Sequence, residues 1–275
     1  MPQRSLSLAI IWLLALASVG FARFRGQWPA YKSLHTWLDG QGLPGWLRNL
    51  DSFAAFMLAA FLGAVIVHRL IARSSVEHRA ARSDLARSPL GLLGLRSGER
   101  GGVLVALIAL GPMIIGGLVL GLRSGDLPAP ASTIVPAVLD GAFRAALMEE
   151  VFFRGLLVGV AAAAIGWSGR PFWINTSLAA ALFAAMHIEW TPQGAADGWP
   201  TLLMTFAGGL WFAWLLVRWR TLWVPMILHA GMNLGWMLAA AKGGAGGGGL
   251  YENLLRAATI ALATWLTVKW TRVER

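Results

Sequence analysis

Long apolar segments separated by short polar ones dominate this chain. Eight of these segments approach or exceed the roughly 20 apolar residues that a helix needs to cross a bilayer. The predicted spans are 5–22, 52–72, 101–122, 134–166, 172–188, 201–217, 222–241 and 254–268. The pattern therefore predicts an all-α fold, a polytopic membrane bundle of about eight transmembrane helices.

The polar segments between the spans predict the topology. Residues 23–51 form a mixed loop with several tryptophans that could lie in the membrane interface, while 191–200 reads as a turn and 242–249 as a flexible glycine-rich loop. From Arg69 to Arg100 there are seven arginines and no lysine, which is typical of a cytoplasmic loop. With eight spans, both termini fall on that same side. The alternative for residues 5–22 is a cleaved signal peptide.

Composition agrees with this topology. The 275 residues are 57% hydrophobic and 13% charged, and the mean hydropathy is +0.61. There is no cysteine, which excludes disulfides, thiolate metal ligands and a cysteine nucleophile. The net charge of +10 comes mostly from residues beside the spans, so topology explains it and no nucleic-acid partner is expected. We expect an integral protein of a bacterial-type cytoplasmic (inner) membrane, with both termini cytoplasmic and membrane lipids as neighbours.

One span breaks the apolar pattern, because 134–166 contains Glu149, Glu150 and Arg154. Each charge at mid-bilayer costs roughly 2.5–3.5 kcal/mol, so these groups must be paired, hydrated or used. Glu150 and Arg154 are i and i+4, which predicts an ion pair. Glu149 points about 100° away from Glu150 and has no partner on its own helix. A carboxylate in that position suits general acid/base work. Asp140 and Arg144, also i and i+4, are interpreted as a structural pair.

The other intramembrane polar residues gather on two later spans. His187 follows Phe183 by four residues, and Asn233 follows His229 by four, so each pair shares one helix face. Taken alone, each histidine is more often a hydrogen-bonded packing residue. A carboxylate and two imidazoles that converge from three helices are what metal-assisted or base-assisted hydrolysis requires.

The ordered motifs Glu149-Glu150-x-x-x-Arg154, Phe183-x-x-x-His187 and His229-x-x-x-Asn233 resemble those of the CPBP intramembrane proteases. That family covers CAAX prenyl endopeptidases and bacteriocin-processing or self-immunity (Abi) proteins. The resemblance indicates a CPBP/Abi-like catalytic core at 131–245, beside N-terminal scaffold helices at 1–130, within one integral membrane domain of residues 1–275.

The resemblance implies hydrolysis of a peptide bond in a small hydrophobic or lipid-modified peptide or protein. Glu149 would be the catalytic base and His187 its partner in activating water, while His229 and Asn233 would stabilise the oxyanion or complete a metal site. Zinc on Glu149, His187 and His229 is one form of the site, and a metal-free Glu/His mechanism is the other. The residues that the resemblance places in the site are Glu149, Glu150, Arg154, His187, His229 and Asn233.

Two alternatives and one geometric conflict remain at this stage. The chain could be a non-catalytic membrane immunity or scaffold protein, or a proton-coupled transporter that uses the carboxylate and histidines as a relay. The conflict is that His187 lies near the end of its predicted helix, whereas Glu149 lies near the middle of its own. Either the helix with Glu149 begins later than Ile134, or the helix before His187 is short and re-entrant.

Overall fold

The structure, a computed structural model, describes residues 2–41, 50–73, 88–96, 101–125, 127, 131–239 and 249–271. Every regular element in these ranges is a helix and none is a strand, which confirms the all-α prediction. Almost all of the predicted glycine-rich loop and most of the arginine-rich loop lie outside the described residues.

Contacts divide the chain into two compact units, which are described separately. The first consists of Met1–Leu93 and Val151–Asn175, and the second of Gly94–Glu150 and Thr176–Arg275. The boundary therefore falls inside the Glu-Glu-x-x-x-Arg motif. The sequence-based division into a scaffold and a catalytic core stays a prediction.

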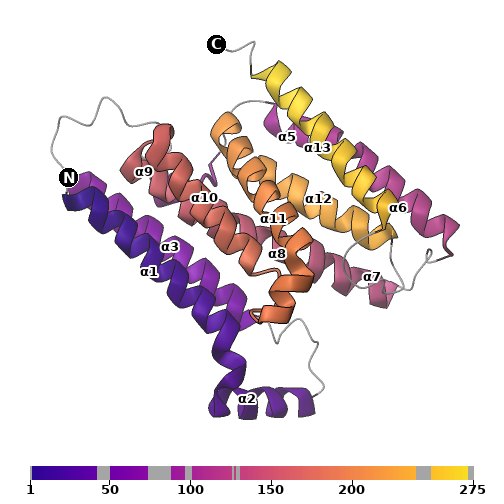
Figure 1. Cartoon of the computed structure of the whole chain (residues 1–275), viewed down its shortest axis with the longest axis horizontal. Helices are drawn as coiled ribbons and strands as arrows, with labels where there is room; N and C mark the ends of the chain where they lie inside the picture. Colours follow the sequence, from indigo (N-terminus) through magenta and orange to yellow (C-terminus); the bar gives the residue numbers. More distant parts are fainter. Residues whose placement is uncertain are drawn as a thin grey trace. The chain divides into compact units, whose positions relative to one another are not determined.

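Two long helices, α1 (Pro2–Phe24) and α3 (Leu50–Arg73), lie side by side in the first unit (Figure 1). Small side chains such as Ala15, Ala60 and Ala64 are fully buried in this unit. Small residues allow close backbone approach, on which helix association in lipid depends. The other elements of this unit are η1 (Arg25–Gln27), α2 (Pro29–Gly40), α4 (Pro89–Leu92), most of η6 (Glu150–Val160), α9 (Ala161–Ile165) and the first turns of α10 (Gly169–Ala185).

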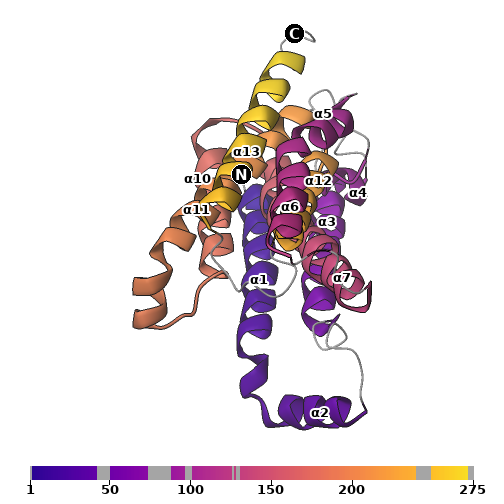
Figure 2. The same cartoon turned by 90° about the vertical axis from the view of Figure 1, so that its right-hand side faces the viewer.

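Helix α12 (Trp223–Ala239) is the central element of the second unit. It contacts α5, α6, η5, α8, α11 and α13, and α6 and α13 also lie beside each other (Figure 2). The elements of this unit are α5 (Gly102–Ala109), α6 (Gly111–Arg123), α7 (Ala131–Ala137), η5 (Val138–Arg144), α8 (Ala145–Glu149), the end of α10, α11 (Pro192–Trp219), α12 and α13 (Leu250–Trp270).

Glycines bring α12 and α6 together at backbone distance. A Cβ added to Gly235 would lie 2.6 Å from the Met113 carbonyl oxygen, and one added to Gly117 would meet the Gly235 carbonyl oxygen. Any larger residue at either position would force the helices apart. This contact fixes α12, and hence the His229 on it, against the rest of the second unit.

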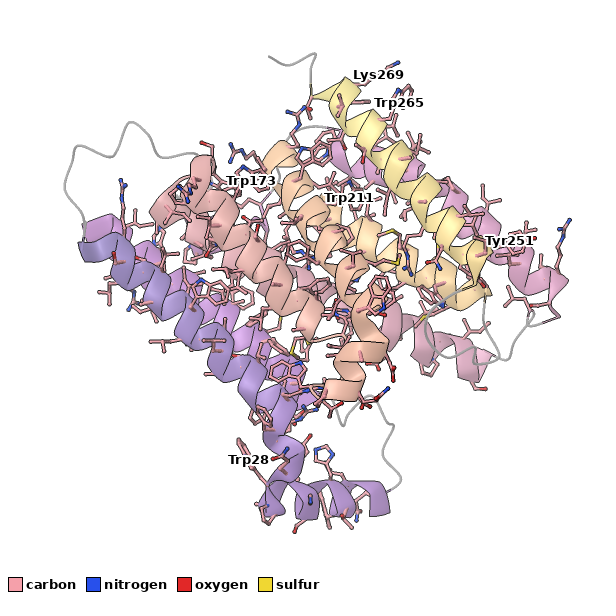
Figure 3. The ribbon with its side chains drawn as sticks, viewed as in Figure 1. Trp28, Trp173, Trp211, Tyr251, Trp265 and Lys269 are labelled. Carbon is pink, nitrogen blue, oxygen red and sulfur yellow. The ribbon has the colours of Figure 1, made fainter. Side chains whose placement is uncertain are left out.

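Four helical stretches among the described residues are long and apolar enough to cross a membrane. They are Arg4–Gln27, Leu50–Ile71, Gly102–Arg123 and Pro192–Trp219. At the end of α13, the Lys269 ammonium lies 4.3 Å from the centre of the Trp265 ring (Figure 3), a pairing suited to a membrane boundary. The structure thus confirms a helical membrane bundle, while the number of eight spans stays a prediction.

The predicted span 134–166 is an unbroken helical run of changing pitch from Ala131 to Ile165. Its segments η5 and η6 are π-helical, a rare turn type that bonds residues i and i+5 and often occurs at functional sites. The expectation that this helix begins later than Ile134 is therefore wrong.

The predicted turn at 191–200 is also wrong, because α11 begins at Pro192. The Thr191 side chain caps the helix by accepting a hydrogen bond from the Gly194 N–H at 2.9 Å, and Pro192 occupies the first turn, where its missing N–H costs nothing. Pro200 lies inside the helix. The prediction of a turn at 191–200 overlooks that a Thr-Pro pair can start a helix.

Candidate active site

The two glutamates lie where the helical pitch changes. Glu149 is the last residue of α8, and Glu150 is the first residue of the π-helical segment η6. Their side chains differ in exposure, since that of Glu149 is 19% exposed and that of Glu150 is completely buried. Neighbouring carboxylates therefore occupy different environments, as their helical spacing predicts.

His187 lies beyond the end of its helix. Helix α10 ends at Ala185, and His187 follows in a turn, where its backbone N–H donates to the Ala184 carbonyl at 3.0 Å. Its Nδ1 lies 2.8 Å from the Phe183 carbonyl oxygen, and its ring packs edge-on against the Phe183 ring with centroids 4.5 Å apart. Because a carbonyl only accepts, Nδ1 carries the proton, and Nε2 of the neutral ring is an acceptor.

His229, on α12, is held on two sides. Its Nδ1 forms a 2.8 Å hydrogen bond with Oε1 of Glu150. Its ring stacks on Phe212 of α11, with centroids 5.2 Å apart and an interplanar angle of 18°, and it meets the edge of Phe183. A carboxylate on Nδ1 and a stacked ring fix the orientation of the imidazole, so Nε2 has a defined direction.

Both imidazoles direct Nε2 toward the same oxygen of Glu149. Oε2 of Glu149 lies 3.6 Å from Nε2 of His229 and 4.0 Å from Nε2 of His187. Both distances exceed that of a direct hydrogen bond. The predicted convergence of one carboxylate and two imidazoles is present, and all three residues belong to the second unit.

The other predicted site residues have separate surroundings. The Asn233 amide donates to the Gly141 carbonyl of η5 at 3.4 Å. Arg154 is 2% exposed, in a part of η6 assigned to the first unit, and its ion pair with Glu150 stays a prediction. Asp140 and Arg144 form the predicted i, i+4 ion pair.

A pocket of about 410 Å³ opens beside His187. The turn after α10 and the first turns of α11 line it, with His187, Ile188, Glu189, Gln193, Gly194, Asp197, Gly198 and Thr201. The His187 side chain is 32% exposed, so one side of the site is accessible. A polar pocket beside the imidazole gives room for part of a substrate chain.

Two features of the site are not predicted by the sequence. Phe212 lies on a span with no site motif, and nothing in its local pattern distinguishes it from a core residue. Glu150 was expected to pair only within its own helix, yet it hydrogen-bonds to His229, 79 residues later. Only the packing of α12 against α8 and η5 brings such distant residues together.

The three residues proposed as zinc ligands do not form a metal shell as placed. Within the described ranges, no three His, Cys, Asp or Glu side chains are grouped so as to hold a metal ion. Zinc binding by Glu149, His187 and His229 stays a prediction.

Together these features define a helical membrane protein in which one carboxylate and two imidazoles lie close together. Residues 131–235 match the family model described as type II CAAX prenyl endopeptidase Rce1-like. No curated protein and no solved structure matches the chain at a significant level.

Through this segment the chain is similar to the CPBP/CAAX protease family. The match contains all three motifs and covers well under half of the 275 residues.

Proposed function

We propose that this chain is an intramembrane endopeptidase that hydrolyses a peptide bond in a small hydrophobic or lipid-modified substrate. The observation that carries the proposal is the approach of two imidazole Nε2 atoms to one Glu149 oxygen, at 3.6 and 4.0 Å. The family match supports peptide-bond chemistry at this site, and the name of that family suggests a prenylated peptide as the first substrate to test.

A water molecule between Glu149 and His187 would be the nucleophile. Two hydrogen bonds of about 2.8 Å from one water fit the 4.0 Å between Oε2 and Nε2. Glu149 takes one proton as the water oxygen bonds to the carbonyl carbon, and His187 accepts the second hydrogen bond and orients the attack. When the carbon–nitrogen bond breaks, Glu149 returns its proton to the leaving nitrogen, so the carboxylate is regenerated.

His229 would stabilise the negative charge that develops on the carbonyl oxygen. An imidazolium has two N–H donors, so Nδ1–H can remain on Glu150 while Nε2–H turns to the oxyanion. Glu150 balances that positive charge and keeps the ring oriented, as the carboxylate of a hydrolase triad does. Asn233 is a second donor in this proposal, because an amide has two N–H groups and the Gly141 carbonyl takes one of them.

The proposed chemistry routes no step through a metal, and this can be tested directly. We expect cleavage to survive prolonged dialysis against a strong chelator. Cleavage that disappears and returns with added zinc would instead assign Glu149, His187 and His229 as ligands of a catalytic ion.

The proposal also includes a location and an orientation. The protein would lie in a bacterial-type cytoplasmic membrane with both termini in the cytoplasm, as the arginine distribution predicts. Reporter fusions at each terminus would give the same cytoplasmic signal, and opposite signals would remove the eight-span topology.

The activity itself is tested with purified protein in proteoliposomes and a quenched fluorescent peptide that carries a prenylated cysteine near its C-terminus. We expect the wild type to cleave the peptide, Glu149→Gln to lose cleavage, and Glu252→Gln on α13 to behave as the wild type. Wild-type rates in Glu149→Gln would overturn the proposal. Flux that depends on a pH gradient, without cleavage, would favour a transporter.

A further inference from the structure

Helix α2 (Pro29–Gly40) has no part in the proposed chemistry, yet its position is well defined. It follows α1 after the short helix η1 and runs across the lower end of α1 (Figure 2). Trp28 marks the corner between them (Figure 3) and is 48% exposed. A helix that crosses the end of a long apolar helix in this way does not continue the span.

The two faces of α2 differ in polarity. Leu34 and Trp37 lie within 60° of each other around the helix axis, and they are 51% and 59% exposed. Lys32 and Thr36 lie close together on the opposite face and are also exposed. Large apolar side chains on one face and polar ones on the other are the mark of a helix that lies in a membrane interface.

A cluster of polar side chains fixes the angle of α2. Arg25 donates from Nε to the Tyr31 hydroxyl at 2.7 Å, and the same nitrogen lies 3.0 Å from Oδ2 of Asp51 at the start of α3. The guanidinium also lies 5.4 Å from the centre of the Tyr31 ring. Burial raises the pKa of Tyr31 despite the opposing effect of Arg25, so the phenol stays neutral at physiological pH. The cluster joins η1, α2 and α3, so specific side-chain contacts hold the corner between α1 and α2.

The helices on either side of α2 place it at the edge of the bilayer. One residue, Trp28, separates it from the candidate span Arg4–Gln27, and the next candidate span begins at Leu50. A segment between two consecutive spans begins and ends at the membrane boundary, and tryptophan is enriched at that depth. The exposed apolar face of α2 therefore has a lipid surface within reach.

We propose that α2 lies flat in the interfacial layer of the bilayer that α1 and α3 cross. Leu34 and Trp37 insert among the acyl chains, and Lys32 and Thr36 face water. The partner is the lipid surface itself. This assignment also gives a role to Lys32, a basic residue that the predicted topology leaves on the non-cytoplasmic side.

The absence of cysteine from the chain makes the test direct. Single cysteines replace Leu34 and Trp37 on one face and Thr36 and Lys32 on the other, and each carries a nitroxide label. The full-length protein is reconstituted in vesicles of phosphatidylcholine and phosphatidylglycerol. Collision with oxygen, which concentrates in lipid, is then compared with collision with a water-soluble nickel chelate.

We expect the ratio of oxygen to nickel accessibility to be several-fold higher at positions 34 and 37 than at 36 and 32. Equal ratios on the two faces would overturn the proposal. Low accessibility to both reagents at 34 and 37, with dipolar broadening between labels, would also overturn it, because a second copy of the chain would then cover the face. The labelling result does not depend on any enzymatic activity. It therefore tests the position of α2 independently of the proposed protease function.

Discussion

Polar side chains of the described residues form two different kinds of arrangement. In the first unit, the Asn175 amide donates to the Leu157 carbonyl at 2.6 Å, and its oxygen accepts the Trp12 indole N–H at 3.0 Å. In the second unit, Oε2 of Glu149 faces two imidazole nitrogens at 3.6 and 4.0 Å. Asn175 is 6% exposed, whereas the His187 side chain is 32% exposed.

The difference separates a structural polar group from a chemical one. At Asn175, donors and acceptors match each other, so the network is complete and holds the helices together. At Glu149, the carboxylate oxygen and the two imidazole Nε2 atoms lie beyond direct hydrogen-bond distance, so these groups are not matched in the same way. From sequence alone, both are polar residues in apolar helices, and only the charge of Glu149 and its place in a motif distinguish it from Asn175.

The contrast between Asn175 and Glu149 predicts that the largest loss of cleavage rate follows substitution of Glu149. Glu149→Gln keeps the size of the side chain and removes its ability to take a proton. We expect the cleavage rate to fall by about 10²- to 10⁴-fold, the usual contribution of a general base. The measurement is hydrolysis of the prenylated fluorescent peptide in proteoliposomes. Unchanged thermal unfolding would show that the loss is chemical, and a rate within a few-fold of wild type would contradict the role.

A smaller effect on rate is expected at Glu150, which hydrogen-bonds to His229 and acts through it in the proposed mechanism. Glu150→Gln retains a hydrogen-bond acceptor for Nδ1 but removes the charge that balances an imidazolium. We expect a loss of roughly 10- to 100-fold, as is usual when the partner of a functional imidazole is changed. The dependence of the rate on pH distinguishes this role from packing. A positioning role alters the pH profile, whereas a merely structural one lowers the amount of folded enzyme and leaves the profile unchanged.

Much of this arrangement could be predicted from the sequence, and the reasons for the exceptions are physical. Apolar length and charge reveal a helix and its charged residues, so the helical bundle and the Asp140–Arg144 pair are confirmed. Rules based on neighbouring residues fail where the partner of a side chain lies far away in the sequence. The bond from Glu150 to His229 and the stacking of Phe212 are set by tertiary packing.

Two further errors concern the ends of helices. The sequence predicts a helix through Ile188, yet α10 ends at Ala185, and the turn that follows presents His187 to Glu149. Hydrophobicity continues past that point, so it does not reveal the break. At the start of α11, the reading of Thr191 and Pro192 as a turn ignored their capping ability.

The hydrogen-bond network of Asn175 should respond in the opposite way to the candidate site at Glu149: its loss should lower stability and leave the cleavage rate unchanged. Asn175→Ala removes two hydrogen bonds from the first unit and leaves Trp12 and Leu157 with unmatched groups. We expect the free energy of unfolding to fall by about 1–2 kcal/mol, near the upper range for polar contacts between membrane helices. The measurement is denaturant unfolding in mixed micelles. The cleavage rate per folded molecule should stay at the wild-type level, and a loss of rate at constant stability would give Asn175 a chemical role.

The smallest effect is expected at the Asp140–Arg144 pair on η5, which is partly exposed to solvent. The two side chains are 31% and 19% exposed, so solvent screens their attraction. Such pairs contribute roughly 0–1 kcal/mol, and Asp140→Asn should lower stability by no more than that. A double-mutant cycle with Arg144→Gln measures the coupling between the two groups. Coupling larger than the whole effect of Asn175→Ala would show that η5 depends on charge pairing, and the contrast between neutral structural contacts and a charged reactive site would then have to be redrawn.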